Sequence, residues 1–145
     1  MMVFGVKHRV ALIHPHWRGH LHSTVAKILN EHGKGSHCIC VGGTGDHIHV
    51  FFSLSVNIAI SDLAREVKSR SSRWINEHKL AMGHFEWQSG YAVFSYSQSD
   101  RQKVINYINN QEEHHRRRSF REEVEKFLEL YNLVSDPRDL PKDLC

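Results

Sequence analysis

The chain has 145 residues, of which 40% are hydrophobic and 24% are charged, and this composition favours one globular domain with a real core. No apolar run is long enough to span a bilayer and no signal-peptide pattern is present, so we expect a cytoplasmic protein without a membrane partner. The formal net charge of +3 is only mildly basic, so the total charge does not by itself establish a nucleic-acid partner.

The predicted elements alternate between strands and helices. In chain order we expect a strand near residues 2–7, a helix near 18–33, strands near 36–42 and 46–54, a basic helix near 59–78, a strand near 91–96, a helix near 99–115, a helix near 119–131 and a tail at 132–145. This βαββαβ order with additional C-terminal helices predicts an α+β sandwich with an antiparallel sheet, ferredoxin-like or RRM-like, formed by residues 1–145 as a single domain. Such sheets carry many activities, so function has to be argued from particular residues.

Three cysteines agree with a reducing compartment. Cys38 and Cys40 fall on the same face of one predicted strand, where a strain-free disulfide across one residue cannot readily close. Cys145 leaves an odd count. We expect all three thiols to be reduced.

The strand near 46–54 carries two histidines one residue apart, His47 and His49. Strand side chains alternate between faces, so the apolar residues at 48, 50, 52 and 54 can enter a core while both imidazoles project from the opposite face. This favours a metal site, although a chain with 13 histidines can also produce such a pair by chance on a half-exposed sheet face. Asp46 adjoins a glycine-rich turn and is interpreted as a turn residue or as a hydrogen-bond partner of the site.

The helix near 59–78 has one apolar stripe and a separate face of basic and hydroxyl side chains. Such a face can hold phosphates, but by charge alone an ordinary solvated helix surface explains it equally well. The residues on this face and just beyond it are Arg65, Lys68, Arg70, Ser72 and Arg73.

The helix near 99–115 presents a phenol and an amide side by side. Val104, Ile105 and Ile108 recur with helical spacing, so Tyr107 and Gln111 lie one turn apart on a neighbouring face. Three other tyrosines compete with Tyr107 as a reactive group and are interpreted as packing residues, although Tyr96 could stack on a base: Tyr91, Tyr96 and Tyr131.

The end of this helix is basic. His114, Arg116 and Arg117 could contact DNA, and cations also suit a helix C-terminus. His114 lies about one turn from Gln111 and could reach a metal or a phosphate, while a solvated histidine is the simpler interpretation.

Four motifs in this order carry a family resemblance. Asp-His-Ile-His at 46–49, Lys-Ser-Arg-Ser-Ser-Arg-Trp at 68–74, Phe-Glu-Trp-Gln-Ser-Gly-Tyr at 85–91 and Tyr-Ile-Asn-Asn-Gln-Glu-Glu-His-His at 107–115 resemble the single-tyrosine HUH transposases of insertion sequences, which include REP-associated relatives. The resemblance spans roughly residues 3–131. It implies a transposase that cleaves and rejoins single-stranded DNA at hairpin-bearing ends.

In that family two histidines and a glutamine bind a divalent cation, which implies His47, His49 and Gln111 as metal ligands. The tyrosine four residues before the glutamine is the nucleophile that links to the DNA 5′ phosphate, which implies Tyr107. The resemblance also favours DNA contact by the basic helix. It further implies a homodimer in which the tyrosine helix can complete the partner's site, and association with the nucleoid when DNA is bound.

The residue types agree with this chemistry. A phenol has an unperturbed pKa near 10, so its attack on a phosphodiester needs activation and neutralisation of the developing charge, which a bound cation supplies. Two imidazoles with an amide oxygen favour transient Mg²⁺ or Mn²⁺ over a closed structural zinc site.

Three alternatives stay open. The first is a domesticated or REP-associated protein that nicks hairpins without mobilising an element. The second is a non-catalytic ferredoxin-like nucleic-acid-binding module whose histidines are structural, and the third is a histidine-rich zinc protein. The binding module predicts single-strand binding that is indifferent to Mg²⁺ and to Tyr107→Phe.

Overall fold

The structure is a computed structural model that describes residues 1–111. The end of the predicted helix at 99–115, the predicted helix at 119–131 and the tail lie outside the described residues. Among the described residues, no helix has the length and apolar character needed to cross a bilayer.

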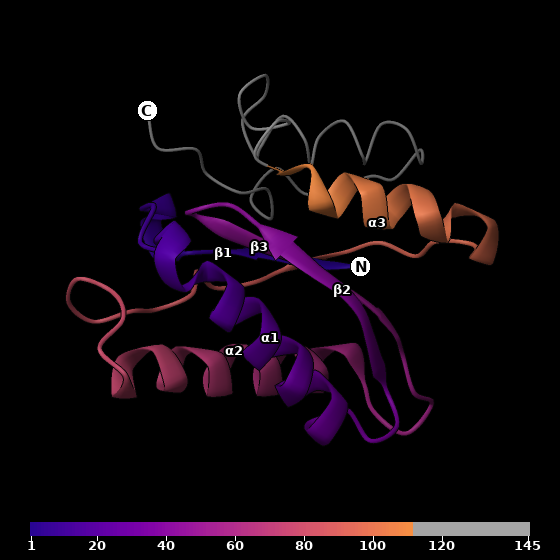
Figure 1. Cartoon of the computed structure of the whole chain (residues 1–145). Coiled ribbons are helices and arrows are strands. Elements are labelled where there is room, and N and C mark those ends of the chain that lie inside the picture. The colour runs from indigo at the N-terminus through magenta and orange to yellow at the C-terminus, as the bar shows by residue number, and fades with distance from the viewer. Residues whose placement is uncertain (112–145) are drawn as a thin grey trace.

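Four strands form one antiparallel sheet in the spatial order β2-β3-β1-β4, with helices on both faces (Figure 1). The elements are β1 (Met2–Gly5), a short 3₁₀ turn η1 (Lys7–Arg9), α1 (Pro15–His32), β2 (His37–Gly43), β3 (His47–Ser53), α2 (Ile60–Glu77), β4 (Ala92–Val93), a second 3₁₀ turn η2 (Gln98–Asp100) and α3 (Arg101–Asn109). This is the predicted α+β fold.

Some boundaries differ from the prediction for local reasons. Helix α1 starts at Pro15 because the His14 ring accepts a hydrogen bond from the His16 amide at 3.0 Å, and proline suits a first helical position. Strand β4 is much shorter than predicted, since its ladder with β1 is confined to Met2–Val93 and Val3–Ala92. Helix α3 starts at Arg101, two residues after the predicted start, and spans Arg101–Asn109 among the described residues.

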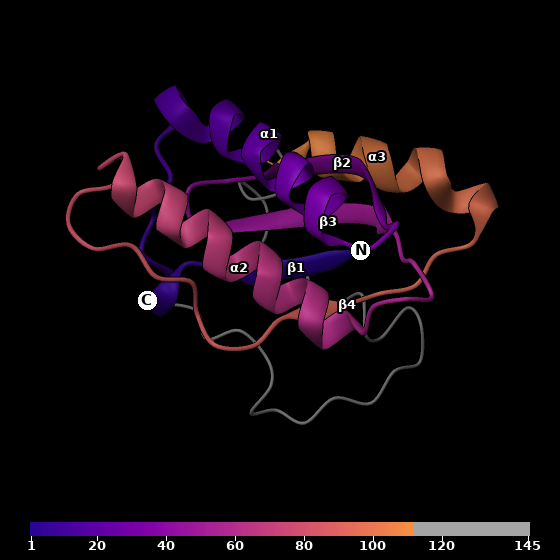
Figure 2. The ribbon, with the colours of Figure 1, turned by 90° about the horizontal axis from the view of Figure 1, so that it is seen from below.

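Helices α1 and α2 cover one face of the sheet and enclose the larger core (Figure 2). The even-numbered residues of β3 point into this core, as the alternation predicts, together with apolar side chains of both helices: Ile48, Val50, Phe52, Leu21, Val25, Leu63 and Val67. Full burial of one such side chain contributes about 1.5–3 kcal/mol. Leu54 was expected in the core but is 45% exposed, because β3 ends at Ser53.

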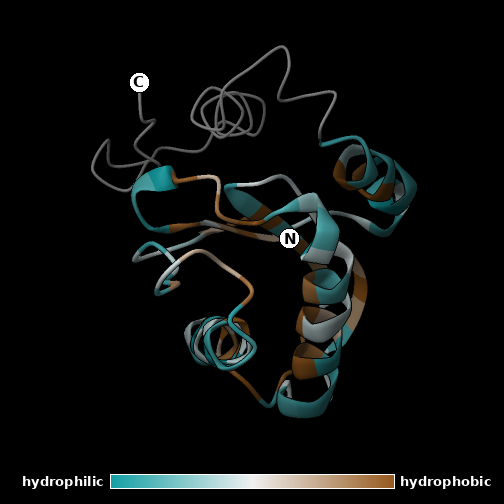
Figure 3. Ribbon diagram, turned by 60° about the vertical axis from the view of Figure 1, so that its left-hand side comes forward, coloured by the Kyte–Doolittle hydropathy of each residue, from teal (hydrophilic) through white to brown (hydrophobic). Residues whose placement is uncertain are grey.

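Helix α3 covers the opposite face and encloses a smaller cluster. Val104 and Ile108 pack there against Val3 and Phe51, which are odd-numbered strand residues. Each helix carries hydrophobic and hydrophilic residues in alternating bands, as expected for amphipathic helices that cover a sheet (Figure 3). The two histidines of β3 lie on this α3 face.

Candidate active site

His47 and His49 lie on a central strand and are almost fully enclosed. Strand β3 sits between β1 and β2, with His47 opposite Gly5 and His49 opposite Gly42. The exposed fractions are 0% for His47 and 2% for His49, and their ring centroids are 5.1 Å apart. The predicted projection of both rings from the face opposite the main core is confirmed, but this face is covered rather than half-exposed.

Helix α3 brings the other two predicted residues to these rings. The Tyr107 ring lies edge-on to His49 with centroids 5.5 Å apart, and the Gln111 Oε1 atom is 3.2 Å from His47 Nε2. Gln111 is 1% exposed, and its Nε2 donates to the Tyr107 carbonyl oxygen at 3.2 Å. The four residues therefore meet within one chain.

Gly42 allows α3 to approach the sheet this closely. A Cβ atom at this position would lie 2.5 Å from Ile108 Cγ2 and 2.7 Å from the Ile108 carbonyl oxygen. Because the carbonyl belongs to the helix backbone, a side chain at residue 42 would force the whole helix to move. This contact sets the height of Tyr107 above the strand.

A hydrogen-bonded group behind His47 fixes its ring. His47 Nδ1 is 2.7 Å from Asp46 Oδ1 and 3.0 Å from the Thr44 hydroxyl, which itself donates to Asp46 Oδ1 at 3.1 Å. Burial alone would raise the pKa of Asp46, but the hydrogen bond with His47 and the guanidinium of Arg9 hold it well below its usual range. A carboxylate at this position favours the tautomer of His47 that carries its proton on Nδ1.

This arrangement fits a divalent cation. When neutral His47 carries its proton on Nδ1, the lone pair of His47 Nε2 faces the amide oxygen of Gln111. The amide group of Gln111 is oriented this way because its Nε2 donates to the carbonyl oxygen of Tyr107. Two acceptors at 3.2 Å repel each other unless a positive charge lies between them. Imidazole nitrogen and amide oxygen are donors that Mg²⁺ or Mn²⁺ can use together with substrate oxygens.

Other metal-binding arrangements lack support in this part of the chain. Within residues 1–111, no group of three histidine, cysteine, aspartate or glutamate side chains is placed to hold a metal. A cation here would therefore rely on the amide oxygen of Gln111 as its third ligand. Cys38 and Cys40 are free thiols, and burial raises the pKa of Cys38 to about 11.

Arg9 belongs to the same group and was missed by sequence reasoning. Its Nη2 donates to Asp46 Oδ2 at 2.8 Å, and its side chain is 4% exposed. Nothing in the local sequence signals this role, because the residue reaches the site through a turn, η1, that no periodicity predicts.

The competing tyrosines lie elsewhere or contact other groups. Tyr91 is 41% exposed beside the short strand β4. Tyr96 packs against Phe51 with ring centroids 6.1 Å apart, in the smaller cluster. Tyr131 lies outside the described residues, as do His114, Arg116 and Arg117.

The basic helix α2 lies on the other side of the sheet from the two histidines, so the structure does not bring the two groups together. Arg65 donates to Asp62 at 2.7 Å and Arg70 to Glu66 at 2.5 Å, both within the helix. The exposed Arg73 extends from the same helix.

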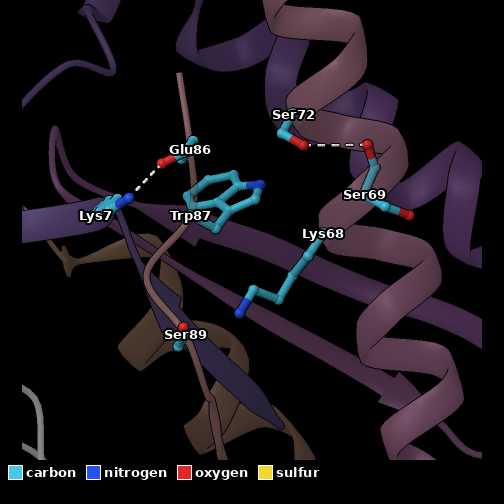
Figure 4. Close-up of a pocket in the computed structure, with 7 residues that line it drawn as sticks. All are labelled: Lys7, Lys68, Ser69, Ser72, Glu86, Trp87 and Ser89. Carbon is cyan, nitrogen blue, oxygen red and sulfur yellow. Dashed lines mark hydrogen bonds and ion pairs between the residues drawn. The ribbon is translucent and has the colours of Figure 1, made fainter. Parts of the chain in front are cut away.

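Lys68 and Ser72 line a polar hollow of about 360 Å³ between α2, the end of β1 and the segment 86–89 (Figure 4). Its lining residues are Lys7, Lys68, Ser69, Ser72, Glu86, Trp87 and Ser89. The Lys68 ammonium donates to the carbonyl oxygens of Gln88 at 2.6 Å and Gly90 at 2.9 Å, and burial lowers its pKa.

Comparisons with known proteins show which proteins this chain resembles. A family model described as "Transposase IS200 like" matches residues 1–111. A protein of Deinococcus radiodurans R1 assigned as a transposase has a similar structure, with a TM-score of 0.58 at 20% identity over 76% of this chain and 87% of that chain. No sequence among the curated proteins is similar enough to count as a relative.

A second solved structure is that of a REP-associated tyrosine transposase bound to a REP hairpin. It has a TM-score of 0.60 at 13% identity and covers 99% of this chain and 91% of that chain. At these identities the two structures show that the fold is shared. The family model spans every described residue, from β1 to Gln111, and on that match the chain belongs to the IS200-like transposase family.

Proposed function

We propose that this protein is a metal-dependent transposase that cleaves and rejoins single-stranded DNA through Tyr107. The observation that carries the proposal is the meeting of Tyr107 and Gln111 with the two histidines of β3 on one buried face. His47, His49 and Gln111 would hold Mg²⁺ or Mn²⁺. When bound, the cation would polarise the scissile phosphate and neutralise its developing charge.

In the proposed reaction the Tyr107 oxygen forms a bond to the phosphorus and loses its proton. The bond between the phosphorus and the 3′ oxygen breaks, and that oxygen leaves as a 3′ hydroxyl after gaining a proton. The product is a 5′-phosphotyrosine linkage. Because the linkage retains the energy of the phosphodiester, the 3′ hydroxyl of another strand can reverse the step without ATP.

We further propose that the DNA contacts both faces of the sheet. The family and the hairpin bound to a structural neighbour support a DNA hairpin as the substrate. The proposed phosphate contacts of α2 are Arg65, Lys68, Arg70, Ser72 and Arg73. Since α2 and α3 cover opposite faces of the sheet, one DNA molecule that touches both helices would have to pass round an edge of the sheet. The hollow beside Lys68 lies on the α2 side (Figure 4).

The test is a cleavage assay on labelled single-stranded hairpins taken from the DNA that flanks the gene. With Mg²⁺ or Mn²⁺, we expect a covalent protein–DNA adduct on a denaturing gel, mapped to Tyr107 by mass spectrometry. Tyr107→Phe and EDTA should each abolish the adduct, while Tyr91→Phe should retain it. Hairpin binding that is unchanged by EDTA and by Tyr107→Phe, without cleavage, would favour the binding-module alternative.

A second candidate is a REP-associated nickase, and the observation behind it is that a structural neighbour, a REP-associated tyrosine transposase, is bound to a REP hairpin. It would form the same adduct but would not join the released end to a second strand. Adding an unlabelled acceptor strand to the cleavage reaction separates the two functions, because only a transposase yields a labelled recombinant product.

A further inference from the structure

A buried arginine stands behind the proposed metal ligands in an unusual backbone conformation. Arg9 is 7% exposed and has φ 56°, directly after His8 with φ 61°. Residues other than glycine held in this left-handed region cost about 1–3 kcal/mol each, and they persist where the surrounding structure over-determines them. The turn η1 therefore places Arg9 at a conformational cost.

The Arg9 side chain runs along the strand pair that carries His47. Gly5 lies opposite His47 in the β1–β3 ladder, and a Cβ atom on Gly5 would be 3.0 Å from Arg9 Cδ. Beyond that point Nη2 donates to Asp46 Oδ2, while Asp46 Oδ1 accepts from His47 Nδ1. A continuous chain of charge-assisted hydrogen bonds thus joins the guanidinium to the imidazole.

We propose that Arg9 is a positioning residue that acts through Asp46 to keep the proton of His47 on Nδ1 and its Nε2 lone pair directed at the metal site. The inference rests on the proposed function, because the prepared lone pair matters only if a cation binds there. Partners that orient a ligating histidine fix its tautomer and ring orientation, and changing one typically weakens metal binding by about 10–100-fold.

The competing state is the other neutral tautomer of His47, and its effect on the site can be argued from the present contacts. If the proton moved to Nε2, His47 would donate to Gln111 Oε1 across the present 3.2 Å, and two proposed ligands would satisfy each other. That bond would close the site to a cation. The Asp46 carboxylate opposes this tautomer because its Oδ1 lies 2.7 Å from His47 Nδ1, and the Arg9 contact at Oδ2 holds the carboxylate in this orientation.

The first test reads the tautomer directly in metal-free protein. Two-dimensional ¹⁵N–¹H NMR of the imidazoles at pH 8 should show His47 protonated at Nδ1 in the wild type. Arg9→Gln should shift His47 towards the Nε2-protonated form, and Arg9→Lys, which keeps the charge, should restore the wild-type pattern. An unchanged tautomer in Arg9→Gln, with the fold intact by circular dichroism, would overturn the proposal.

The second test measures Mn²⁺ affinity by isothermal titration calorimetry. We expect Arg9→Gln to bind Mn²⁺ about 10–100-fold more weakly than the wild type. Lys7→Gln is the matched control, since Lys7 lies in the same turn and also pairs with a carboxylate, Glu86 at 2.7 Å, but at an exposed site. Its affinity should be unchanged.

The two proposals fail in different ways. If the wild type bound no Mn²⁺, the metal-dependent function would fall, while the tautomer would still decide the role of Arg9. If the wild type and Arg9→Gln bound Mn²⁺ equally well, the positioning role would fall and the proposed function would stand.

Discussion

His22 on α1 shows how a single partly buried residue ties stability to pH. Burial, together with the nearby positive charge of Arg18, lowers the pKa of His22 to about 4. Below pH 6.5 the unfolded chain takes up a proton that the folded protein does not bind until about pH 4. This group therefore removes stability as the pH falls through that window and has no effect above it.

We expect the free energy of unfolding of the wild type to fall by up to ~1.4 kcal/mol per pH unit between pH 6.5 and 4 through this residue. The free energy of unfolding of His22→Gln, measured by urea unfolding across pH 4–8, should lack this part of the dependence on pH. His20→Gln, at an exposed position on the same helix, should keep the wild-type slope. Equal slopes for the wild type and His22→Gln would contradict the prediction.

At the same scale, the sequence indicates which residues to propose for the chemistry but not which residues support them. The alternation of β3 and the four-residue spacing of Tyr107 and Gln111 are properties of short segments, so they could be predicted. Arg9 could not, because its role depends on two residues with positive φ and on a partner 37 positions away.

At the level of elements, the placement of α3 depends on the absence of a side chain at Gly42. We expect Gly42→Ala to destabilise the fold by about 1–3 kcal/mol, since the new Cβ overlaps the Ile108 backbone. Strand cleavage should fall about 100-fold if Tyr107 moves by about 1 Å. Chemical unfolding and the adduct assay measure the two effects.

Gly19→Ala provides the control. Gly19 lies within α1, and a Cβ there meets nothing within 4 Å. This substitution should raise stability by about 0.5–1 kcal/mol and leave cleavage unchanged. Wild-type cleavage by Gly42→Ala would show that α3 is not held by this contact.

Two cations on α2 should separate a structural role from DNA contact. Lys68→Met retains most of the aliphatic stem but loses the two hydrogen bonds to the carbonyl oxygens of Gln88 and Gly90. We therefore expect this variant to lose about 1–3 kcal/mol of stability and to show faster hydrogen exchange near residue 90.

Arg73 lies at an exposed position. Arg73→Met should leave stability unchanged and should weaken hairpin binding, and the affinity should depend less steeply on salt concentration. Unchanged affinity for both variants would remove α2 from the DNA interface.

The order and type of the elements could be predicted because each long segment has its own hydrophobic period. Their ends could not, since these depend on contacts such as the His14 ring on the His16 amide. The placement of α2 and α3 on opposite faces also has no local signal. It depends on tertiary packing, because α1 and α2 cover one face of the sheet and α3 packs on the other.

For the whole molecule, the structure bears on whether one subunit or two build an active site. Gln111 contacts His47 of its own chain at 3.2 Å, and Tyr107 lies against its own His49. We therefore expect that mixing the His47→Ala/His49→Ala variant with Tyr107→Phe restores no cleavage, even if the subunits pair. Recovery of the adduct in the mixture would show that the tyrosine helix serves a partner's metal site.

The close contact at Gly42 also has a consequence for inheritance. Every other amino acid carries a β-carbon, so every missense change in this codon introduces the overlap with Ile108. The cationic surface of α2 lies on the far side of the sheet from that overlap. If the proposed function holds, a gene copy that decays by random substitution has, in this one codon, a route to a descendant that keeps the cationic surface of α2 but cleaves hairpin DNA far more slowly.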